Sequence, residues 1–151
     1  MRIISNSVRD TINLGVALAK HLSSGDIICL EGELGAGKTT LTKGIAEGLG
    51  VSKAKVTSSS FILIRQHLEG RLALFHFDLY RLKEPLDLAR LGYEEYLYGE
   101  GVSVIEWAKK LECLMPKERL MVELSYGLGS KRVIKITARG ARYKDLLRKI
   151  K

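Results

Sequence analysis

The stretch that decides the fold is a glycine-rich segment early in the chain, which reads Gly32, Glu33, Leu34, Gly35, Ala36, Gly37, Lys38, Thr39 and is followed by Thr40. It matches the pattern G-x-x-x-x-G-K-[ST] at every fixed position. This pattern is typical of a loop whose backbone amides surround a polyphosphate, because glycines allow close approach and positive φ angles. The sequence therefore predicts a phosphate-binding loop over residues 32–39.

The segments on either side of this loop have the periodicities that the motif requires. Before it, residues 26–30 form a short apolar run, typical of a strand that is covered on both faces. After it, Leu41, Ile45 and Leu49 recur every four residues, and Gly50 follows as a helix stop. Strand, loop and helix thus follow one another in the order that places phosphates at a helix N-terminus.

The motif assigns chemistry to two side chains in particular. Lys38 is expected to reach the β- and γ-phosphates as a point charge, and the hydroxyl of Thr39 is placed to bind Mg²⁺. The first amides of the following helix and its positive dipole end add to the attraction for phosphate. The loop therefore predicts a nucleotide and Mg²⁺ as ligands.

Composition indicates a single folded domain over residues 1–151. The chain has 46% hydrophobic and 28% charged residues with two prolines, which is ordinary globular composition. No apolar run approaches the roughly 18 residues that span a bilayer, and residues 1–9 lack the apolar core of a signal peptide. We expect a cytoplasmic protein that does not enter a membrane. Cys29 and Cys113 are expected to be free, buried thiols.

Excess positive charge is confined to the C-terminal segment, residues 131–151. Residues 1–130 contain 16 basic and 16 acidic side chains, whereas residues 131–151 contain nine basic side chains and one acid. Such a segment attracts the phosphates of RNA or of a nucleotide, or an acidic protein face. The alternative is a solvated helix surface that keeps the protein soluble.

The rest of the chain alternates helical and extended patterns. Helices are expected over 7–22, 85–91, 93–98 and from about 141, and strands over 61–67, 71–77, 102–105, 120–124 and 132–137. The strands at 61–67 and 71–77 flank Glu69-Gly70 and predict an antiparallel hairpin. Together these elements predict an α/β fold, the three-layer architecture of P-loop NTPases, with a mixed, mainly parallel central sheet that includes this hairpin.

Two carboxylates at predicted strand ends are candidates for the catalytic centre. Glu106 ends the apolar segment 102–105, and Asp78 ends the segment 71–77. Catalysis needs a carboxylate on or near Mg²⁺, so one of them could bind the metal while the other orients water or closes a switch. Their roles stay open here, since a carboxylate at a strand end also serves as a helix cap. His76 is expected to be packed or hydrogen-bonded rather than an acid-base group.

The identity of the nucleotide is indicated by what the sequence lacks. Guanine-specific switches usually carry N-K-x-D, but the asparagines are Asn6 and Asn13, both before the loop. ATP is therefore the expected nucleotide. The chain also has no long insertion that would form the lid or acceptor domain of a small-molecule kinase, which favours a small hydrolase over a phosphotransferase.

Three motifs together resemble the bacterial TsaE (YjeE) family along nearly the whole chain. They are G-x-L-G-A-G-K-T-T at residues 32–40, H-x-D-L-Y-R at residues 76–81 and I-E-W at residues 105–107. The first is shared by many NTPases, whereas the other two are specific in this order and spacing. The resemblance implies the P-loop ATPase of tRNA threonylcarbamoyladenosine (t6A) biosynthesis. Such a protein would act with proteins similar to TsaB and TsaD, which place threonylcarbamoyl on adenosine 37 of tRNAs reading codons that begin with A.

The same resemblance implies roles for individual residues. Thr39 and Glu106 would hold Mg²⁺, while Lys38 and the loop amides would hold the phosphates of ATP or ADP. Asp78 and Trp107 would support hydrolysis. Turnover would be slow without partners and would reset the complex. The alternative is an ATP-gated binding module that does not require turnover.

Two further likenesses concern the edges of the site. Thr40 resembles the family's second loop threonine, and Thr11 lies where the family places a residue near the adenine. The family's switch segment, similar to V-x-S-P-T-F, is represented at residues 56–61, where Ser59 replaces the proline and Ser60 the threonine. The Ser60 hydroxyl keeps a group that can contact water or phosphate, but loss of the proline frees the backbone.

Overall fold

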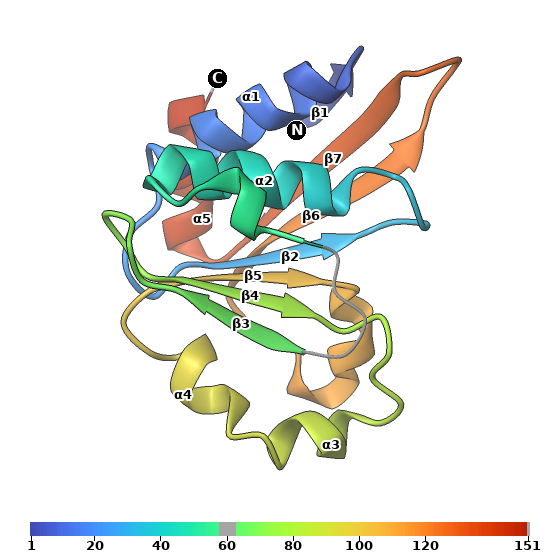
Figure 1. Cartoon of the computed structure of the whole chain (residues 1–151). Helices are drawn as coiled ribbons and strands as arrows, with labels where there is room; N and C mark the ends of the chain where they lie inside the picture. Colours follow the sequence, from blue (N-terminus) through green and yellow to red (C-terminus); the bar gives the residue numbers. More distant parts are fainter. Residues whose placement is uncertain (58–62, 151) are drawn as a thin grey trace.

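Seven strands form one sheet in the computed structural model, which describes residues 1–57 and 63–150 (Figure 1). Within these residues the order across the sheet is β1-β7-β6-β2-β5-β4-β3. The strands are β1 (Arg2–Ser5), β2 (Ile27–Glu31), β3 (Ile64–His67), β4 (Leu74–Asp78), β5 (Val102–Glu106), β6 (Arg119–Tyr126) and β7 (Arg132–Arg139).

The centre of the sheet is parallel and both of its edges are antiparallel. β2 pairs in parallel with β5 on one side and with β6 on the other, and β4 pairs in parallel with β5. β3 joins β4 as the predicted antiparallel hairpin, while β6, β7 and β1 form the other edge. The prediction of a mixed sheet with a parallel centre is confirmed. Because β2, β5 and β4 run in the same direction, their carboxyl ends meet at one edge of the sheet.

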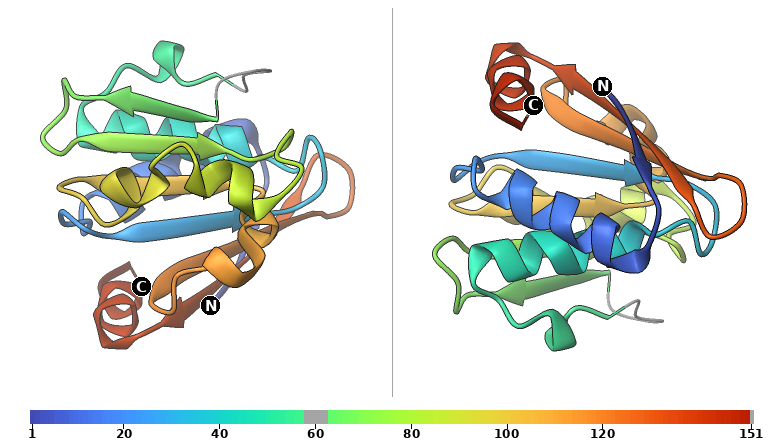
Figure 2. Two further views of the ribbon diagram at one scale, coloured as in Figure 1. Left: turned by 90° about the horizontal axis from the view of Figure 1, so that it is seen from below. Right: turned by 90° about the horizontal axis from the view of Figure 1, so that it is seen from above.

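Helices cover both faces of the sheet, which confirms the three-layer prediction (Figures 1 and 2). α1 (Val8–Ala19) and α2 (Lys38–Leu49) lie on one face, and α3 (Pro85–Ala89), α4 (Tyr93–Leu97) and the 3-10 helix η2 (Ala108–Leu114) lie on the other. α5 (Ala141–Ile150) packs beside β7, and the short η1 (Lys53–Lys55) follows α2. In the described part of the chain, no helix is long and apolar enough to cross a bilayer.

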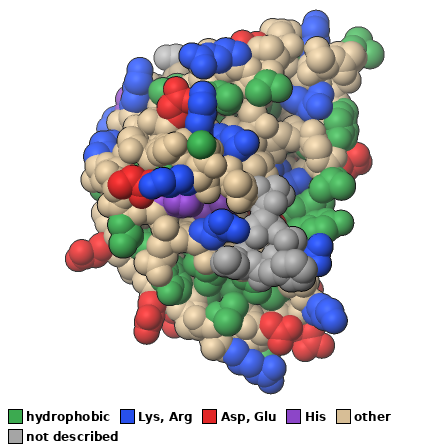
Figure 3. All heavy atoms as spheres, in the orientation of Figure 1, with side chains coloured by type: hydrophobic (Ala, Val, Ile, Leu, Met, Phe, Trp, Pro, Cys, Tyr) green, Lys and Arg blue, Asp and Glu red, His purple; other side chains and the backbone are tan. Residues whose placement is uncertain are grey.

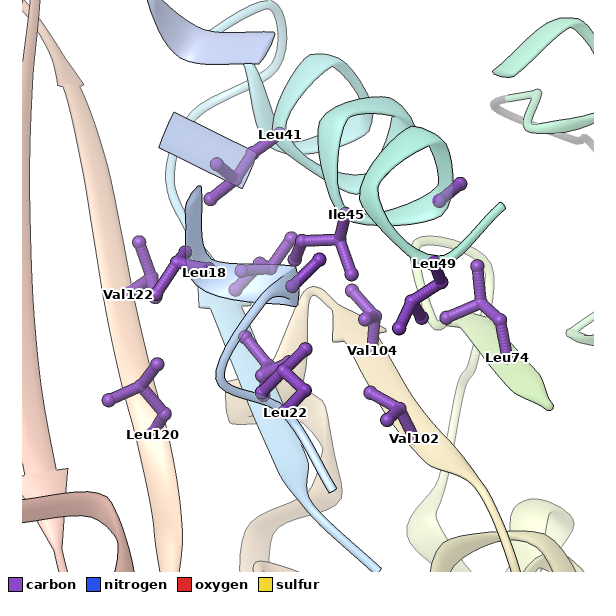
Figure 4. Close-up of a cluster of buried hydrophobic side chains, with 14 of the residues drawn as sticks. Leu18, Leu22, Leu41, Ile45, Leu49, Leu74, Val102, Val104, Leu120 and Val122 are labelled. Atoms are coloured by element: carbon purple, nitrogen blue, oxygen red, sulfur yellow. The ribbon is translucent and has the colours of Figure 1, made fainter. Parts of the chain in front are cut away.

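Each face of the sheet has its own hydrophobic core. On one face, Leu18 of α1, Leu22 just after this helix and Ile45 of α2 pack with Val104 and Val122 of the strands (Figure 4). On the other face, the core forms between the sheet and the helices α3, α4 and η2. β2 supplies residues to both cores, because successive side chains of a strand point to opposite faces.

Local signals set the ends of the two helices near the loop. The side-chain oxygen of Ser7 accepts a hydrogen bond from the backbone N–H of Asp10 at 3.1 Å and caps α1. Gly50 ends α2 in the left-handed conformation, at φ 85°. The two helices touch at Gly44, where a Cβ would lie 2.3 Å from the carbonyl oxygen of Ile12. This close approach holds α1 beside the helix that follows the loop.

Some features differ from the sequence-based expectations. β1 is absent from the prediction, because its four residues are too few to show a period and become a strand by pairing with β7. The first helix ends at Ala19 instead of residue 22.

Cys29 is buried as expected, but Cys113 is exposed, because it follows a kink at Glu112 and lines an open cavity. Both thiols are free.

The basic segment, residues 131–151, is an integral part of the fold. It supplies all of β7 and all of α5, with residue 151 outside the described residues. Tyr143 and Leu146 of α5 are buried in the core on the α1 and α2 side. The segment therefore contributes to folding as well as to surface charge.

Candidate functional site

The glycine-rich loop follows β2 and leads into α2, as the sequence predicts (Figure 1). Gly32 has φ 152° and Gly37 has φ 110°, conformations that side-chain-bearing residues rarely adopt. A Cβ on Gly32 would lie 2.3 Å from the carbonyl oxygen of Leu124 on β6. Glycine is therefore required at this position for the loop to pass close to the neighbouring strand.

The side chain of Lys38 is folded back against the loop. Its Nζ donates hydrogen bonds to the carbonyl oxygens of Gly32 at 2.5 Å and Glu33 at 3.0 Å. The same nitrogen lies 3.8 Å from the centre of the Trp107 ring, a cation–π contact. Burial lowers the pKa of Lys38, and the negative charge of Glu106 opposes this shift. The ammonium is thus held by groups that phosphate oxygens are able to replace.

Trp107 reaches Lys38 from an unusual backbone conformation. Its φ is 59°, in the left-handed region, which is uncommon for a bulky residue and occurs preferentially at functional sites. The centre of its ring lies 5.1 Å from that of the half-exposed Tyr80. Trp107 therefore forms one aromatic wall beside the loop.

Glu106, at the end of β5, connects that strand to the helix after the loop. Its Oε2 accepts a hydrogen bond from Oγ1 of Thr39 at 2.9 Å. Its Oε1 lies 2.8 Å from Nε2 of His76 on β4 and 3.2 Å from Oγ1 of Thr42 on α2. Thr39 and Glu106 thus present a hydroxyl and a carboxylate oxygen side by side, and oxygens are the ligands that Mg²⁺ prefers.

Asp78, the second candidate carboxylate, is the register partner of Glu106 on the neighbouring strand β4. Its Oδ1 accepts a hydrogen bond from the backbone N–H of Tyr80 at 3.1 Å. Burial raises the pKa of Asp78, the Tyr80 amide opposes this shift, and the charge of Glu106 raises the pKa further. Of the two carboxylates that the sequence leaves open, Glu106 is the one that binds Thr39.

Two adjoining cavities open on the loop. The larger, of about 350 Å³, is lined by Leu34, Gly35, Gly37, Lys38, Thr39, Thr40, Glu106 and Trp107. The smaller, of about 100 Å³, is lined by Ser7, Val8, Thr11, Gly35, Gly37, Thr40, Ser130 and Arg132. Thr11 is buried, and its Oγ1 lies 2.7 Å from Oγ of Ser5. The structure therefore brings Thr11 of α1 to the same site as Thr39 and Thr40 of α2.

Some of the predicted loop residues contribute backbone rather than side chain. Ala36 is fully buried and belongs to the core under α2. Leu34 is 68% exposed, and Glu33 offers its carbonyl oxygen to Lys38. At these positions a phosphate would meet main-chain amides, as the loop motif implies.

The end of β6 and the start of β7 also contact the loop, and sequence reasoning does not identify them. Tyr126 donates its hydroxyl hydrogen to the carbonyl oxygen of Leu34, and Arg132 donates to that of Gly35 at 3.4 Å. The guanidinium carbon of Arg132 lies 4.5 Å from the centre of the Tyr126 ring. These two residues are register partners, so they reach the loop only through the pairing of β6 with β7, which has no local sequence signal.

A larger cavity, of about 980 Å³, lies at the opposite end of the sheet. Its walls come from the start of β2, from α4, from η2 with the residues that follow it, and from α5. The three motifs contribute none of its lining residues, and its buried acid, Asp26, is paired with Arg142 at 2.6 Å. Size alone therefore does not locate the functional site, whereas the side-chain chemistry converges on the loop.

The predicted switch segment is described only in part. Residues 58–61 lie outside the described residues, so the expectations for Ser59 and Ser60 stay predictions. Among residues 1–57 and 63–150, no group of three or more His, Cys, Asp or Glu side chains could hold a metal ion by itself.

Several basic side chains of the C-terminal segment have acidic partners. Arg142 binds Asp26 at 2.6 Å, and Arg148 binds Asp145 at 2.9 Å. Others, such as Lys144, are exposed. On the face shown in Figure 3, basic and acidic side chains are interspersed. The surplus positive charge is thus carried by the exposed members of the segment.

Comparison with known proteins agrees with the motifs. The family model described as "Threonylcarbamoyl adenosine biosynthesis protein TsaE" matches residues 5–134. The "tRNA threonylcarbamoyladenosine biosynthesis protein TsaE" of Bacillus subtilis is 43% identical over 128 residues, covering 85% of this chain and 79% of that protein. Its namesake from Nostoc is 40% identical over 141 residues, covering 91% and 85%. A crystal structure of Bacillus subtilis YdiB has a TM-score of 0.85 at 37% identity and covers 99% of this chain and 93% of that one.

Proposed function

Because the chain belongs to the TsaE family of tRNA threonylcarbamoyladenosine biosynthesis, we propose that it is a Mg²⁺-dependent ATPase whose nucleotide cycle supports or resets a complex similar to TsaB and TsaD. That complex would install threonylcarbamoyl on adenosine 37 of tRNAs that read codons beginning with A, and the protein would act with it in the cytoplasm. The observation that carries the proposal is the hydrogen bond between Thr39 and Glu106. It unites the phosphate loop and a carboxylate in one site.

The loop supports nucleotide binding mainly through its backbone. Its amides and the N-terminus of α2 favour the negative charge of phosphates, and Lys38 lies within the same loop. The cavity of about 350 Å³ beside Lys38 and Thr39 would take the phosphates of ATP or ADP. The adjoining smaller cavity, lined by Thr11 and Arg132, would take the adenine side of the nucleotide.

The residues present fit Mg²⁺, because Thr39 and Glu106 offer hard oxygen ligands 2.9 Å from each other. When bound, Mg²⁺ would neutralise negative charge that develops on the phosphates. Lys38 would hold phosphate oxygens, and Asp78, oriented by the amide of Tyr80, would position the attacking water. Trp107 would exclude bulk water from one side of the site.

The β6–β7 hairpin supports a coupling between nucleotide and partner. It contacts the loop through Tyr126 and Arg132, and Leu128 in its turn is 89% exposed. A change in the loop between the ATP and ADP states would therefore reach a surface that a partner protein can read.

The basic C-terminal segment would contact tRNA phosphates or an acidic partner face. Lys131, Lys144 and Lys149 are exposed and belong to this segment. Their joint replacement by glutamine is expected to weaken tRNA binding and to reduce its salt slope by about one for each lost phosphate contact. If tRNA binding is unchanged and partner binding falls, the surface recognises an acidic protein.

The test of the proposed activity is ATP turnover with and without partners similar to TsaB and TsaD. The wild type is expected to release inorganic phosphate in a Mg²⁺-dependent reaction that partners accelerate. Glu106→Gln is expected to bind ATP but to lose turnover by at least about 100-fold, since it removes a metal ligand. Equal turnover by the two proteins would contradict the role of Glu106.

The two alternatives have distinct outcomes in the same assay. If Glu106→Gln supports many rounds of tRNA modification in a reconstituted system, the protein is an ATP-gated binding module without required turnover. If labelled γ-phosphate appears on a small-molecule acceptor instead of as inorganic phosphate, the protein is a phosphotransferase.

A further inference from the structure

The carboxylate of Glu106 is contacted at Oε1 by side chains from two different elements. Nε2 of His76 on β4 lies 2.8 Å from this oxygen, and Oγ1 of Thr42 on α2 lies 3.2 Å from it. Thr42 is fully buried, and His76 and Glu106 are each only 2% exposed. Bulk water is therefore excluded from Oε1, so protein groups must satisfy this oxygen.

The hydrogen that Oε1 accepts comes mainly from His76. Thr42 has a single hydroxyl hydrogen, and its Oγ1 lies closer to the carbonyl oxygen of Lys38, at 2.9 Å, than to Glu106. A carboxylate accepts but does not donate, so Nε2 of His76 must carry a hydrogen. This geometry assigns the Nε2–H form to the imidazole.

We propose that His76 is a positioning residue for Glu106, with Thr42 as a second support. By holding Oε1, they prevent rotation of the carboxylate and keep Oε2 directed at Thr39 and the Mg²⁺ position. Without such support a glutamate carboxylate rotates readily, because its terminal torsion has a broad, twofold profile. The inference rests on the function proposed above and adds a role for a residue that the sequence assigns only to packing or hydrogen bonding.

The size of the expected effect follows from metal sites in general. Groups that hydrogen-bond to a metal ligand typically change metal affinity or activity by about 10- to 100-fold when they are removed. They do so without contacting the nucleotide. Nucleotide binding in the absence of Mg²⁺ should therefore be unaffected by the loss of His76.

The test compares His76→Leu, which removes the N–H donor, with His76→Gln, whose side-chain N–H can take its place. His67→Leu is the matched control: His67 lies on the adjacent strand β3, is 7% exposed, and its Nε2 has no hydrogen-bond partner within the described residues. Calorimetry of ADP binding with and without Mg²⁺ and steady-state ATP hydrolysis give the readouts.

His76→Leu is expected to lower kcat and the Mg²⁺-dependent part of ADP affinity by about 10- to 100-fold, with ADP affinity unchanged when Mg²⁺ is absent. His76→Gln should restore most of the loss, and His67→Leu should behave as the wild type. Thr42→Val replaces threonine by a side chain of nearly the same shape without the hydroxyl. It should lower kcat and the Mg²⁺-dependent part of ADP affinity by less than His76→Leu does.

A measurement on the wild-type protein does not depend on whether a variant folds. Nitrogen-15 NMR of histidine-labelled protein is expected to show His76 in the Nε2–H tautomer. The Nδ1–H tautomer would overturn the proposal, because Nε2 would then have no hydrogen to donate to Glu106.

The kinetic outcomes separate this inference from the proposed function. Wild-type kcat and Mg²⁺ dependence in His76→Leu would overturn the positioning role and leave the ATPase proposal intact. Equal losses in His76→Leu, His76→Gln and His67→Leu would assign His76 to folding alone and also overturn it. A wild-type protein that neither binds ADP nor hydrolyses ATP would remove the proposed function, and the positioning role with it.

Discussion

The ammonium nitrogen of Lys38 lies 3.8 Å from the centre of the Trp107 ring while it donates hydrogen bonds to the loop carbonyls of Gly32 and Glu33. The loop thus holds its own cation with neutral acceptors and an aromatic face. Phosphate oxygens carry a full negative charge and form stronger, charge-assisted hydrogen bonds. We therefore predict that Lys38 exchanges these partners for phosphate when a nucleotide binds.

This exchange predicts an optical signal, because Trp107 is the one tryptophan of the chain. ATP or ADP is expected to change the tryptophan fluorescence as the ammonium moves away from the ring. Lys38→Ala should alter the emission before any nucleotide is added and weaken nucleotide binding by about 100-fold or more, since it removes charge-assisted hydrogen bonds of about 1.5–3 kcal/mol each. Lys20→Ala, at an exposed position after α1, is the control. A nucleotide response in Lys38→Ala equal to that of the wild type would contradict the exchange.

Asp78 is predicted to reduce stability at neutral pH. Its pKa is raised, first by burial. An acid with a higher pKa in the folded state binds more protons there than in the unfolded state, so stability falls as the pH rises through the interval between the two pKa values. Asp78→Asn should therefore raise Tm at about pH 7, with a smaller gain as the pH approaches about 4. Thermal unfolding over this range measures the effect, and a lower Tm for Asp78→Asn at neutral pH would refute it.

The same substitution is expected to lower ATP turnover, because the asparagine carries no negative charge to orient an attacking water. A gain in stability together with a loss of activity is the usual relation at a functional site. Measuring both quantities on one preparation of Asp78→Asn separates a folding defect from a chemical one.

Gly44→Ala is expected to destabilise the protein by about 1–2 kcal/mol in urea unfolding. Alanine has the higher helix propensity by about 1 kcal/mol, but its Cβ would lie 2.3 Å from the backbone oxygen of Ile12, and such overpacking costs about 1–3 kcal/mol or more. The control is Glu47→Ala on an exposed position of the same helix, which should change stability by less than about 0.5 kcal/mol. A more stable Gly44→Ala would show that α1 and α2 separate easily.

Arg142→Ala is expected to destabilise the fold by about 1–3 kcal/mol, because it leaves the buried carboxylate of Asp26 without its cation. The hydrogen bond to Asp26 is also the main reason that the pKa of Arg142 is raised. The double variant Asp26→Ala, Arg142→Ala should lose less stability than the two single losses added together. Strict additivity in chemical unfolding would argue against the pair as a coupled unit.

Elements close to strong local signals were predictable from sequence. The loop at residues 32–39, the strand before it and the helix from Lys38 to Leu49 all agree with the structure, as does the hairpin of β3 and β4. Short-range rules suffice here, because a glycine pattern, a helical period and a helix stop at Gly50 each act within a few residues of the backbone they shape.

Contacts between distant segments were decided by the tertiary structure. Thr39 and Glu106 are 67 residues apart, and they meet because β5 is the parallel neighbour of β2. His76 reaches the same carboxylate because β4 is the next strand in the sheet. The position of Thr42 beside Thr39 could be predicted from sequence, because a spacing of three residues in a helix places both side chains on one face. Its contact with Glu106 also depends on the tertiary structure.

The amino-acid order by itself determined the position of the glycine-rich loop, the strand before it and the helix after it, and it predicted which loop residues would bear its chemistry. The motif resemblance already paired Glu106 with Thr39, and the sheet showed how they meet. Only the folded sheet decided that Tyr126 and Arg132 contact the loop and that β1 is a strand. The physical reason is the distance along the chain over which each interaction acts. Local propensity depends on neighbouring residues, whereas strand order and register depend on packing among all the elements together.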